Sequence, residues 1–243
     1  MSDKGIKAVI LAAGMGIRLK PYTDVTPKPL VEVAGRRIIL RLLEILEKKG
    51  VGQVIIVTGY MSSLMRETVE KEFDGDLDIV FAHSDLYETT NNIYSLYCAM
   101  PYVNDSDFFL FEGDVIFDEN ILMDFDPQHT SWFVDKFHKG MDGCCIQAAD
   151  DGRIEKISIL KKEEFVPDAF KSLGILYFDQ QTSAVIQELL NEYVFKQRLG
   201  IYYDIMLSEN LDRFKCRVFD IMGRTWIEVD DENDYMKAGQ MYG

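Results

Sequence analysis

Lys7-Ala-Val-Ile-Leu-Ala-Ala-Gly-Met-Gly-Ile-Arg18 is the stretch that decides the fold of this 243-residue chain. Its apolar run over 8–11 predicts a buried strand, and this strand leads directly into a loop that contains Gly14 and Gly16. Glycines at the carboxyl end of a strand let backbone amides approach an anionic group, because no Cβ stands between them. Arg18 adds a planar fork suited to phosphate oxygens. The stretch therefore predicts a polyphosphate cradle on an α/β sheet.

Two common phosphate-binding patterns do not fit this loop. The dinucleotide fingerprint needs a third glycine where Leu19 stands, and the Walker loop needs a Gly-Lys-Ser/Thr that is absent here. The pattern that remains is Leu-x-x-Gly-x-Gly-x-Arg, followed by Thr26-Pro-Lys-Pro-Leu30, in which Lys28 supplies a compact point charge. This longer pattern is far more specific than a pair of glycines.

The pattern resembles the signature of the sugar-phosphate nucleotidylyltransferase superfamily. This resemblance implies an α/β fold of the nucleotide-diphospho-sugar transferase type, which is a Rossmann-like three-layer sandwich with a mostly parallel mixed sheet. It also implies that Lys28 and Arg18 are the catalytic residues, because they bind the phosphates of a nucleoside triphosphate. The loop residues expected around that nucleotide are Leu11, Ala12, Ala13, Gly14, Met15 and Gly16.

Strand-like and helix-like patterns alternate after the loop. Apolar residues at helical spacing predict a helix that ends at Gly50, and Pro101 is expected to stop a later helix that Thr90 or Asn91 caps. The predicted strands lie over 54–57, 78–82 and 108–112, and the predicted helices around 38–46, 62–72 and 91–100. This order is βαβαβ, so ligands are expected beyond the carboxyl ends of parallel strands.

The second half of the chain shows shorter elements. Strands are predicted over 132–134, 143–147 and 173–178, and helices near 181–193 and 202–212. Because no linker or repeat interrupts the pattern, we expect a single nucleotidyltransferase domain over 1–243. Residues 1–130 are expected to bind the nucleotide, and 131–243 to bind the acceptor and complete the metal site.

Polar residues at two predicted strand ends are expected to face the nucleotide. Thr58-Gly59-Tyr60 follows the strand over 54–57, and Glu112 and Gly113 follow the apolar run that begins at 108. Because the carboxyl ends of parallel strands meet at one edge of the sheet, we predict that both groups border the nucleotide.

Asp114, Glu228 and Asp230 are the predicted ligands of Mg²⁺. Asp114 follows a buried strand and a glycine, and Glu228 and Asp230 lie two residues apart, so that on a strand they share a face. Nucleotidyl transfer uses Mg²⁺ held by carboxylates and phosphate, because charge builds on the triphosphate during the reaction. The competing interpretations are that Asp114 is a turn residue, and that Asp230 or Asp231 caps the final helix.

Other segments resemble cytidylyltransferases within this superfamily. Thr90-Asn-Asn-Ile-Tyr-Ser-Leu-Tyr97 and Tyr202-Tyr-Asp204 look like elements of bacterial phosphocholine cytidylyltransferases. Glu112-Gly-Asp114, Val134-Asp135 and Gly140-Met-Asp-Gly143 look like 2-aminoethylphosphonate cytidylyltransferases. The resemblance implies CTP as the donor, and it places Asn91, Asn92 and Ser95 near the nucleotide.

The acceptor in both branches is a small phosphate or phosphonate that carries a cationic amine. Aromatic faces attract quaternary ammonium, whereas a primary ammonium also needs hydrogen-bond acceptors. Tyr203 and Asp204 are the first candidates, because one of two neighbouring helical residues is expected to face the crevice, and Asp135 is the next. Most aromatic residues of this half, among them Trp132, Phe133, Phe137, Tyr177 and Tyr202, are individually more typical of a core. The choice between the acceptors stays open.

Composition excludes several classes of function. The formal charge is −15, which argues against generic binding to nucleic acid or to an anionic membrane surface. No apolar run approaches a membrane span, Met1-Ser-Asp-Lys-Gly5 lacks the apolar centre of a signal peptide, and the four cysteines have no Cys-x-x-Cys spacing. We therefore expect a cytoplasmic enzyme with reduced thiols. A homodimer is an open alternative, because an apolar surface patch would suffice to form one.

Two further functions compete with cytidylyl transfer. A nucleotidylyltransferase for a sugar or inositol phosphate would use the same loop, although polyol recognition favours amide and carboxylate side chains over the aromatic residues of the second half. A non-catalytic regulatory subunit would keep the nucleotide fold. Such subunits often lose the residues that carry the reaction, whereas Arg18, Lys28, Asp114 and Asp230 are all present here.

Overall fold

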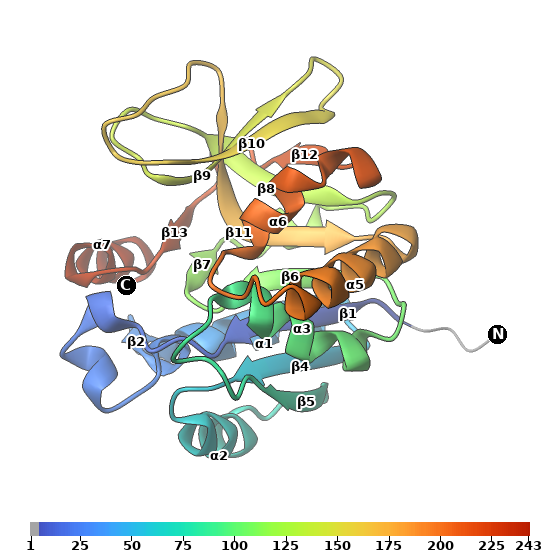
Figure 1. Ribbon diagram of the computed structural model, residues 1–243. Helices are drawn as coiled ribbons and strands as arrows, with labels where there is room; N and C mark the ends of the chain where they lie inside the picture. Colours follow the sequence, from blue (N-terminus) through green and yellow to red (C-terminus); the bar gives the residue numbers. More distant parts are fainter. Residues whose placement is uncertain (1–4) are drawn as a thin grey trace.

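A mixed sheet of nine strands forms the centre of the protein in the computed structural model, which describes residues 5–243 (Figure 1). Its main path has the order β10-β9-β11-β6-β1-β4-β5, and β8 and β12 extend it beside β11. The four neighbouring strands β6, β1, β4 and β5 are parallel to one another, and β11 is antiparallel to β6. This arrangement confirms the predicted α/β fold with a mostly parallel mixed sheet. Residues 1–4, on which the expectation about a signal peptide partly rests, lie outside the described range.

The first half of the chain builds the parallel part of the sheet. The strands β1, β4, β5 and β6 are parallel because a segment that contains a helix connects each of them to the next, as the βαβαβ pattern predicts. The elements in chain order are β1 (Lys7–Ala12), β2 (Glu32–Val33), β3 (Arg36–Arg37), α1 (Ile38–Lys49), β4 (Gln53–Thr58), α2 (Ser62–Glu72), β5 (Asp78–His83), α3 (Asn92–Val103), β6 (Phe108–Glu112), β7 (Val115–Phe117) and α4 (Asn120–Met123).

The second half adds β8 to β12 to the same sheet, with β9, β10 and β11 antiparallel to their neighbours and β12 parallel to β8, whereas β13 pairs with β7 in a separate two-stranded sheet. The elements are β8 (Ser131–Lys136), β9 (Gly143–Ala148), β10 (Ile154–Leu160), β11 (Phe170–Phe178), α5 (Gln180–Phe195), α6 (Tyr203–Glu209), β12 (Arg217–Asp220), β13 (Trp226–Glu228) and α7 (Glu232–Tyr242). The register of β11 shifts between Ser172 and Leu176, and its first residues pair with both β8 and β9. In Figure 1, β9 and β10 rise above the parallel strands, so that the second half covers one edge of the nucleotide half.

Two large hydrophobic cores lie on the two faces of the sheet. Successive side chains of β1 alternate between them: Ala8, Ile10 and Ala12 pack in the core that contains α1, and Val9 packs in the core that contains α3, α5 and α6. Because both faces of β1 are covered, the strand is apolar from Ala8 to Ala12.

Some predicted boundaries differ from the structure. Pro101 does not stop its helix, because α3 continues to the fully buried Val103 and ends at Asn104, which adopts a left-handed conformation. The helix predicted near 202–212 ends at Glu209, and the strands β10 and β12 were not predicted. Among residues 5–243, no helix combines the length and the apolar character that a membrane crossing requires.

Candidate active site

The loop after β1 is held in place by a glycine that no other residue can replace without strain. Gly16 has a φ of 61°, and a Cβ there would lie 2.9 Å from Thr23 Cγ2 and 3.1 Å from Lys28 Cβ. The Thr23 hydroxyl also donates a hydrogen bond to the carbonyl oxygen of Gly16, at 2.8 Å. The loop therefore packs directly on the segment that carries Lys28.

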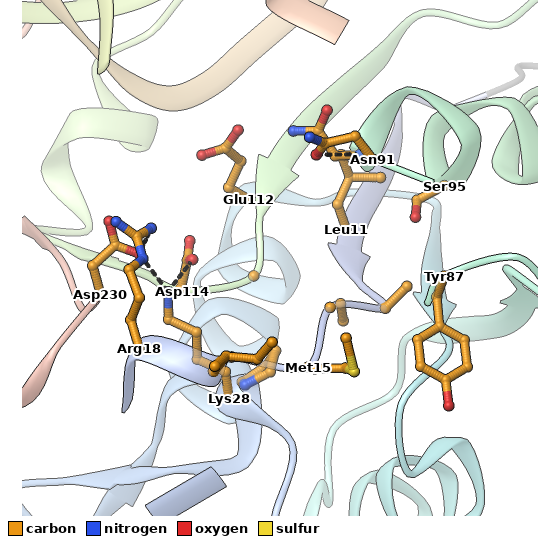
Figure 2. A pocket seen from close by; sticks show the side chains of 18 of the residues that line it. Leu11, Met15, Arg18, Lys28, Tyr87, Asn91, Ser95, Glu112, Asp114 and Asp230 are labelled. Carbon is orange, nitrogen blue, oxygen red and sulfur yellow. Dashed lines mark hydrogen bonds and ion pairs between the residues drawn. The ribbon is translucent and has the colours of Figure 1, made fainter. Parts of the chain in front are cut away.

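A cavity of about 460 Å³ opens between this loop and the ends of α3 and β6 (Figure 2). Charged residues gather at one end of it, and Tyr87, Asn91 and Ser95 lie at the other. The structure thus brings most of the predicted nucleotide residues together. Those that line the cavity are Leu11, Ala12, Ala13, Gly14, Met15, Gly16, Arg18, Lys28, Asn91, Asn92, Ser95, Glu112 and Gly113.

Lys28 is the central cation of the charged end. Its ammonium donates to Asp114 Oδ2 at 2.6 Å and to Asp230 Oδ1 at 2.7 Å, and only 12% of its side chain is exposed. Burial alone would lower the pKa of Lys28, but the two carboxylates outweigh burial and raise this pKa. Arg18, whose side chain is 70% exposed, donates to the same Asp230 oxygen at 2.7 Å. One exposed and one buried cation thus lie beside the glycine loop.

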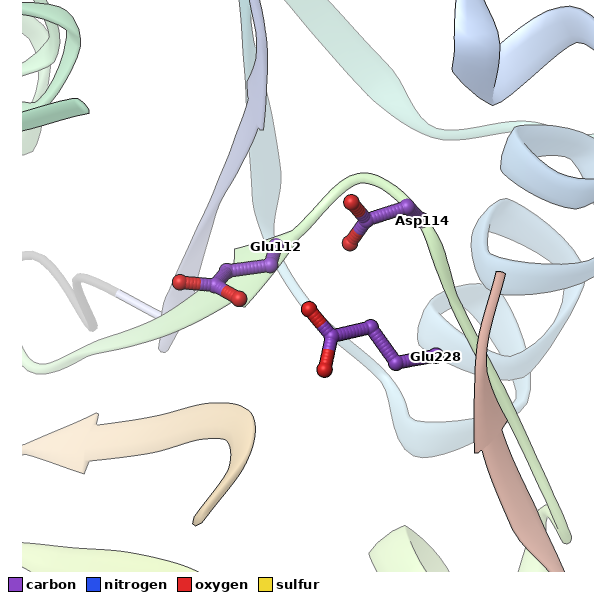
Figure 3. A group of neighbouring side chains, drawn as sticks. All are labelled: Glu112, Asp114 and Glu228. Carbon is purple, nitrogen blue, oxygen red and sulfur yellow. The ribbon is translucent and has the colours of Figure 1, made fainter. Parts of the chain in front are cut away.

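Three carboxylates, from Glu112, Asp114 and Glu228, converge beside Lys28 (Figure 3). One oxygen of each lies within 4.8 Å of the others. Burial, reinforced by Asp114 and Asp230, raises the pKa of Glu228 to about 7, and burial together with the charge of Asp204 raises the pKa of Glu112. Among residues 5–243, the buried Asp114 Oδ1 has no hydrogen-bond partner. Such mutually repelling oxygens are a donor set that fits a hard divalent cation.

This group differs from the predicted Mg²⁺ ligands in one member. Asp114 and Glu228 belong to it, whereas Asp230 is paired with Lys28 and Arg18. Burial would raise the pKa of Asp230, but these cations outweigh burial and lower it. Glu112, predicted to contact the nucleotide, belongs to this group and also lines the first cavity. Asp231 caps α7 by accepting a hydrogen bond from Asp234 N, so the capping and the metal-binding interpretations of this acidic stretch apply to different residues.

The amide side chains at the start of α3 tie the two halves together. Asn91 caps the helix, and its own N–H donates to the carbonyl oxygen of Leu199 at 2.8 Å. Asn92 Oδ1 accepts from the backbone N–H of Tyr203 at 2.9 Å. The end of the first cavity at Asn91 and Asn92 is therefore fixed by hydrogen bonds to the segment before α6.

Three predicted residues lie beside the glycine loop but do not line the first cavity, which has a volume of about 460 Å³. They are Thr58, Gly59 and Tyr60. Thr58 is buried and bonds to Ala82 O, and a Cβ at Gly59 would lie 2.7 Å from the ring of Tyr87. Tyr60 donates its N–H to Ala13 O at 3.0 Å and its hydroxyl to Thr23 O at 3.0 Å. Tyr87 covers the end of β4, so these residues contact the loop from behind, and their place beside a nucleotide stays a prediction.

A second cavity, of about 470 Å³, adjoins the first. The second half of the chain provides most of its lining, including Asp142, Cys144, Lys171 and Asp204. The two cavities share five lining residues, which are Arg18, Glu112, Tyr202, Glu228 and Asp230. The shared residues include two of the three converging carboxylates, so a group bound in either cavity would border them.

The predicted acceptor residues are divided by the structure. Asp204 lines the second cavity, whereas Tyr203 is fully buried and donates its hydroxyl to Glu112 Oε1 at 3.0 Å. Asp135 also lies outside the cavity lining, because it accepts a hydrogen bond from Trp226 Nε1 at 2.9 Å. Tyr203 thus contacts the carboxylate of Glu112, Asp135 contacts β13, and the contact of either residue with an acceptor stays a prediction.

Lys171 is a site residue that the sequence did not reveal. Its ammonium lines the second cavity 3.6 Å from Glu228, and 13% of its side chain is exposed. Burial would lower the pKa of Lys171, but the charges of Glu228, Cys144, Glu112 and Asp142 together outweigh burial and raise it. The available signal was a lone lysine in the apolar run of β11, where a cation has to have a partner.

Comparisons with known proteins agree with this site. The Nucleotidyl transferase family matches residues 7–142. A choline-phosphate cytidylyltransferase from Streptococcus pneumoniae is 29% identical, with 97% of this chain and 98% of the relative aligned. A 2-aminoethylphosphonate cytidylyltransferase from Lancefieldella rimae is 23% identical over 92% of this chain and 87% of the relative.

A mannose-1-phosphate guanylyltransferase catalytic subunit beta from Danio rerio is 33% identical over 98% of this chain, but only 64% of that relative is covered. The solved structure of the CTP:phosphocholine cytidylyltransferase from Streptococcus pneumoniae superposes with a TM-score of 0.84 and 26% identity, covering 98% of this chain and 100% of that one. The glycine loop, the paired cations and the family match lead to one conclusion: the chain is a nucleotidyltransferase and belongs to the Nucleotidyl transferase family.

Proposed function

We propose that the protein is a Mg²⁺-dependent cytidylyltransferase, which transfers CMP from CTP to the phosphate or phosphonate of a small amine-bearing acceptor and releases pyrophosphate. The observation that carries this proposal is the junction of the two cavities at Arg18, Glu112, Tyr202, Glu228 and Asp230. A nucleotide in the first cavity and an acceptor in the second would meet at this junction, which is the geometry that a direct transfer between two small molecules requires.

The triphosphate is assigned to the charged end of the first cavity. There the glycine loop offers backbone amides, and Lys28 and Arg18 offer their charges. Because Lys28 is held by Asp114 and Asp230, an incoming triphosphate competes with these carboxylates for the ammonium. Lys28 and Arg18 thereby stabilise the negative charge that grows on pyrophosphate as it leaves.

The carboxylates of Asp114, Glu112 and Glu228 would hold Mg²⁺, and Asp230 remains a predicted further ligand beside them. When bound, this ion supplies positive charge that polarises the phosphate oxygens of the donor. The unpartnered Asp114 Oδ1 supports the assignment, because a buried carboxylate oxygen without a hydrogen bond is costly unless a cation binds it.

The transfer itself needs no covalent bond to the protein. An anionic oxygen of the acceptor attacks the α-phosphorus of CTP, and the bond from that phosphorus to the bridging oxygen of the β-phosphate breaks. Pyrophosphate leaves with the electron pair of the broken bond. Lys171 borders the side from which the acceptor arrives, where its charge would orient the attacking phosphate.

The choice of CTP and of an amine-bearing acceptor rests on likeness and on charge. The pneumococcal and Lancefieldella relatives, named for choline phosphate and for 2-aminoethylphosphonate, align over most of this chain. The carboxylate of Asp204 in the second cavity suits a cationic group. The similarity to a mannose-1-phosphate guanylyltransferase keeps a sugar phosphate as the second candidate acceptor.

The test is pyrophosphate release with Mg²⁺ across the four nucleoside triphosphates. Each nucleotide is paired with phosphocholine, phosphoethanolamine, 2-aminoethylphosphonate, glucose 1-phosphate, mannose 1-phosphate and inositol 1-phosphate. We expect turnover with CTP and an amine-bearing acceptor, and reactions without acceptor measure the background hydrolysis. Turnover confined to a sugar or inositol phosphate would contradict the proposal, and nucleotide binding without any turnover would favour a regulatory protein.

A further inference from the structure

We infer that the acceptor carries a primary ammonium group, which binds the buried carboxylate of Asp204, and that the second cavity discriminates against quaternary ammonium. This inference rests on the proposed function and deepens it, because it selects phosphoethanolamine or 2-aminoethylphosphonate over phosphocholine. The phosphate and the phosphonate share the recognised ammonium, so only a direct comparison distinguishes them.

Asp204 has a buried carboxylate oxygen without a hydrogen-bond partner among the described residues. Only 7% of this residue is exposed, and it lines the second cavity. Within the described part of the chain, its Oδ1 has no hydrogen-bond partner. Lys171, a cation in the same cavity, is paired with Glu228 at 3.6 Å, and no ion pair within 4.0 Å joins a described cation to Asp204. A buried carboxylate oxygen in this position needs a donor from a ligand.

The charges around Asp204 favour a cation. Burial raises the pKa of Asp204 to about 6, so above neutral pH the group is ionised and accepts hydrogen bonds. The lining of this cavity holds six carboxylates, among them Glu112, Glu228, Asp142 and Glu163, against four basic residues, which are Arg18, Lys161, Lys162 and Lys171. Lys171 and Arg18 lie toward the shared carboxylates, where the acceptor's phosphate has to reach the nucleotide. The cavity therefore offers cations to one end of a zwitterion and, at the other, the Asp204 carboxylate, which interacts with the Cys144 thiol and the charge of Lys171 but whose Oδ1 has no hydrogen-bond partner among the described residues.

Aromatic side chains are the second observation. Tyr202, which is 48% exposed, is the one aromatic residue among those that line the second cavity. Trp132 is fully buried with its indole N–H bonded to Ser172 Oγ, and Phe133 and Tyr177 pack in the core around β8 and β11. Quaternary ammonium groups bind best inside several aromatic faces. A single tyrosine beside carboxylates does not form such a cage.

Methylation of the amine removes the N–H donors that would bind Asp204 Oδ1. A primary ammonium has three N–H donors, whereas a trimethylammonium has none and would leave Asp204 Oδ1 buried and unpaired. Sites built around a buried hydrogen bond reject an analogue that lacks the donor more strongly than apolar sites reject an extra methylene. We therefore expect kcat/KM to decrease with each added methyl group.

The experiment measures kcat/KM with CTP for 2-aminoethylphosphonate, phosphoethanolamine, its N-methyl and N,N-dimethyl derivatives, and phosphocholine. We expect a total decrease on the order of 100-fold from the primary to the quaternary amine. The Asp204→Asn variant should raise KM for the primary amines by roughly tenfold or more and flatten the series. If the role of Asp204 were purely structural, the variant would instead lower kcat/KM for all acceptors by the same factor.

The matched control is Asp168→Asn, which removes the same charge from an exposed residue outside both cavities. It should keep the kcat/KM series of the unchanged protein. If Asp204→Asn does not fold, the methylation series of the unchanged protein and the Asp204→Glu variant still decide the question. Phosphocholine as the best acceptor would overturn the inference but leave cytidylyl transfer intact, whereas turnover with sugar phosphates alone would overturn both.

Discussion

The two cavities of this protein are built in opposite ways. The nucleotide cavity takes its loop and both of its cations from residues 11–28, and the glycine loop holds a fixed backbone shape. The second cavity collects side chains from segments around 142–144, 159–163, 171–174 and 202–204, which meet only in the folded sheet. In the proposed reaction, triphosphate recognition is therefore local and set by the backbone, whereas acceptor recognition is non-local and set by a few charged side chains. Acceptor preference can accordingly change without disturbance of the loop.

The largest effect is expected at Asp114, in the group of three carboxylates beside Lys28. Asp114→Asn should lower kcat by on the order of 1,000-fold or more, because it removes a carboxylate from the metal group and a partner of Lys28. The measurement is turnover together with Mn²⁺ binding in the presence of CTP, with Asp168→Asn as the charge-matched control. Near-normal activity of a folded Asp114→Asn protein would contradict the metal assignment.

A smaller effect, confined to the nucleotide side, is expected at the glycine loop. Gly16→Ala should raise KM for CTP by roughly tenfold and destabilise the fold by about 1–3 kcal/mol, because the new Cβ approaches Thr23 and requires an unfavourable φ. KM for the acceptor should stay within about twofold. Gly14→Ala is the control for stability, since a Cβ there meets no atom within 4 Å. Equal thermal unfolding of the two variants would show that Gly16 is not constrained.

The sequence predicts the local glycine loop better than the second cavity, which is formed by segments far apart in the chain. The loop, the parallel strands and the pairing of Lys28 with phosphate-binding glycines could be predicted, because a local pattern of apolar residues and glycines determines them. Asp204 and Tyr203 could be named together but not distinguished, since only the packing of the seven-residue helix α6 decides which one faces the cavity. Lys171 was missed because the irregular pairing of β11 sets its direction.

The shared carboxylates should make stability depend on pH. In the folded protein burial raises the pKa of Glu228 from its ordinary 4.5 to about 7. Between these values the folded state binds more protons at this site than the unfolded state, so the free energy of unfolding should fall as pH rises from about 4.5 to about 7. Glu112 and Asp204, whose pKa values burial also raises, act in the same direction.

Glu228→Gln should therefore be more stable than the unchanged protein at pH 8 by roughly 1–3 kcal/mol, with the difference shrinking toward pH 5. Thermal unfolding in EDTA without substrates would detect this as a rise in Tm of several degrees. Glu155→Gln is the surface control, because that glutamate is exposed and paired only with Arg153. A Glu228→Gln protein that is less stable than its parent at pH 8 would show that the Lys171 pair outweighs the cost of burial.

The smallest effect is expected at Asp135, which lines neither of the two cavities. Asp135→Asn weakens the hydrogen bond from Trp226 and should cost about 1 kcal/mol of stability, while KM for the acceptor should change by less than about twofold. Steady-state kinetics and thermal unfolding check both values. A tenfold rise in KM for the acceptor, without loss of stability, would return Asp135 to the acceptor site.

The central claim is that the two substrates react directly across the junction of the cavities. The most direct test uses a CTP analogue with a single-configuration thiophosphate at the α-phosphorus and determines the configuration of the CMP-thiophosphate product. One in-line displacement predicts inversion at this phosphorus. Retention would require two displacements through an intermediate bound to the protein, and it would contradict this account.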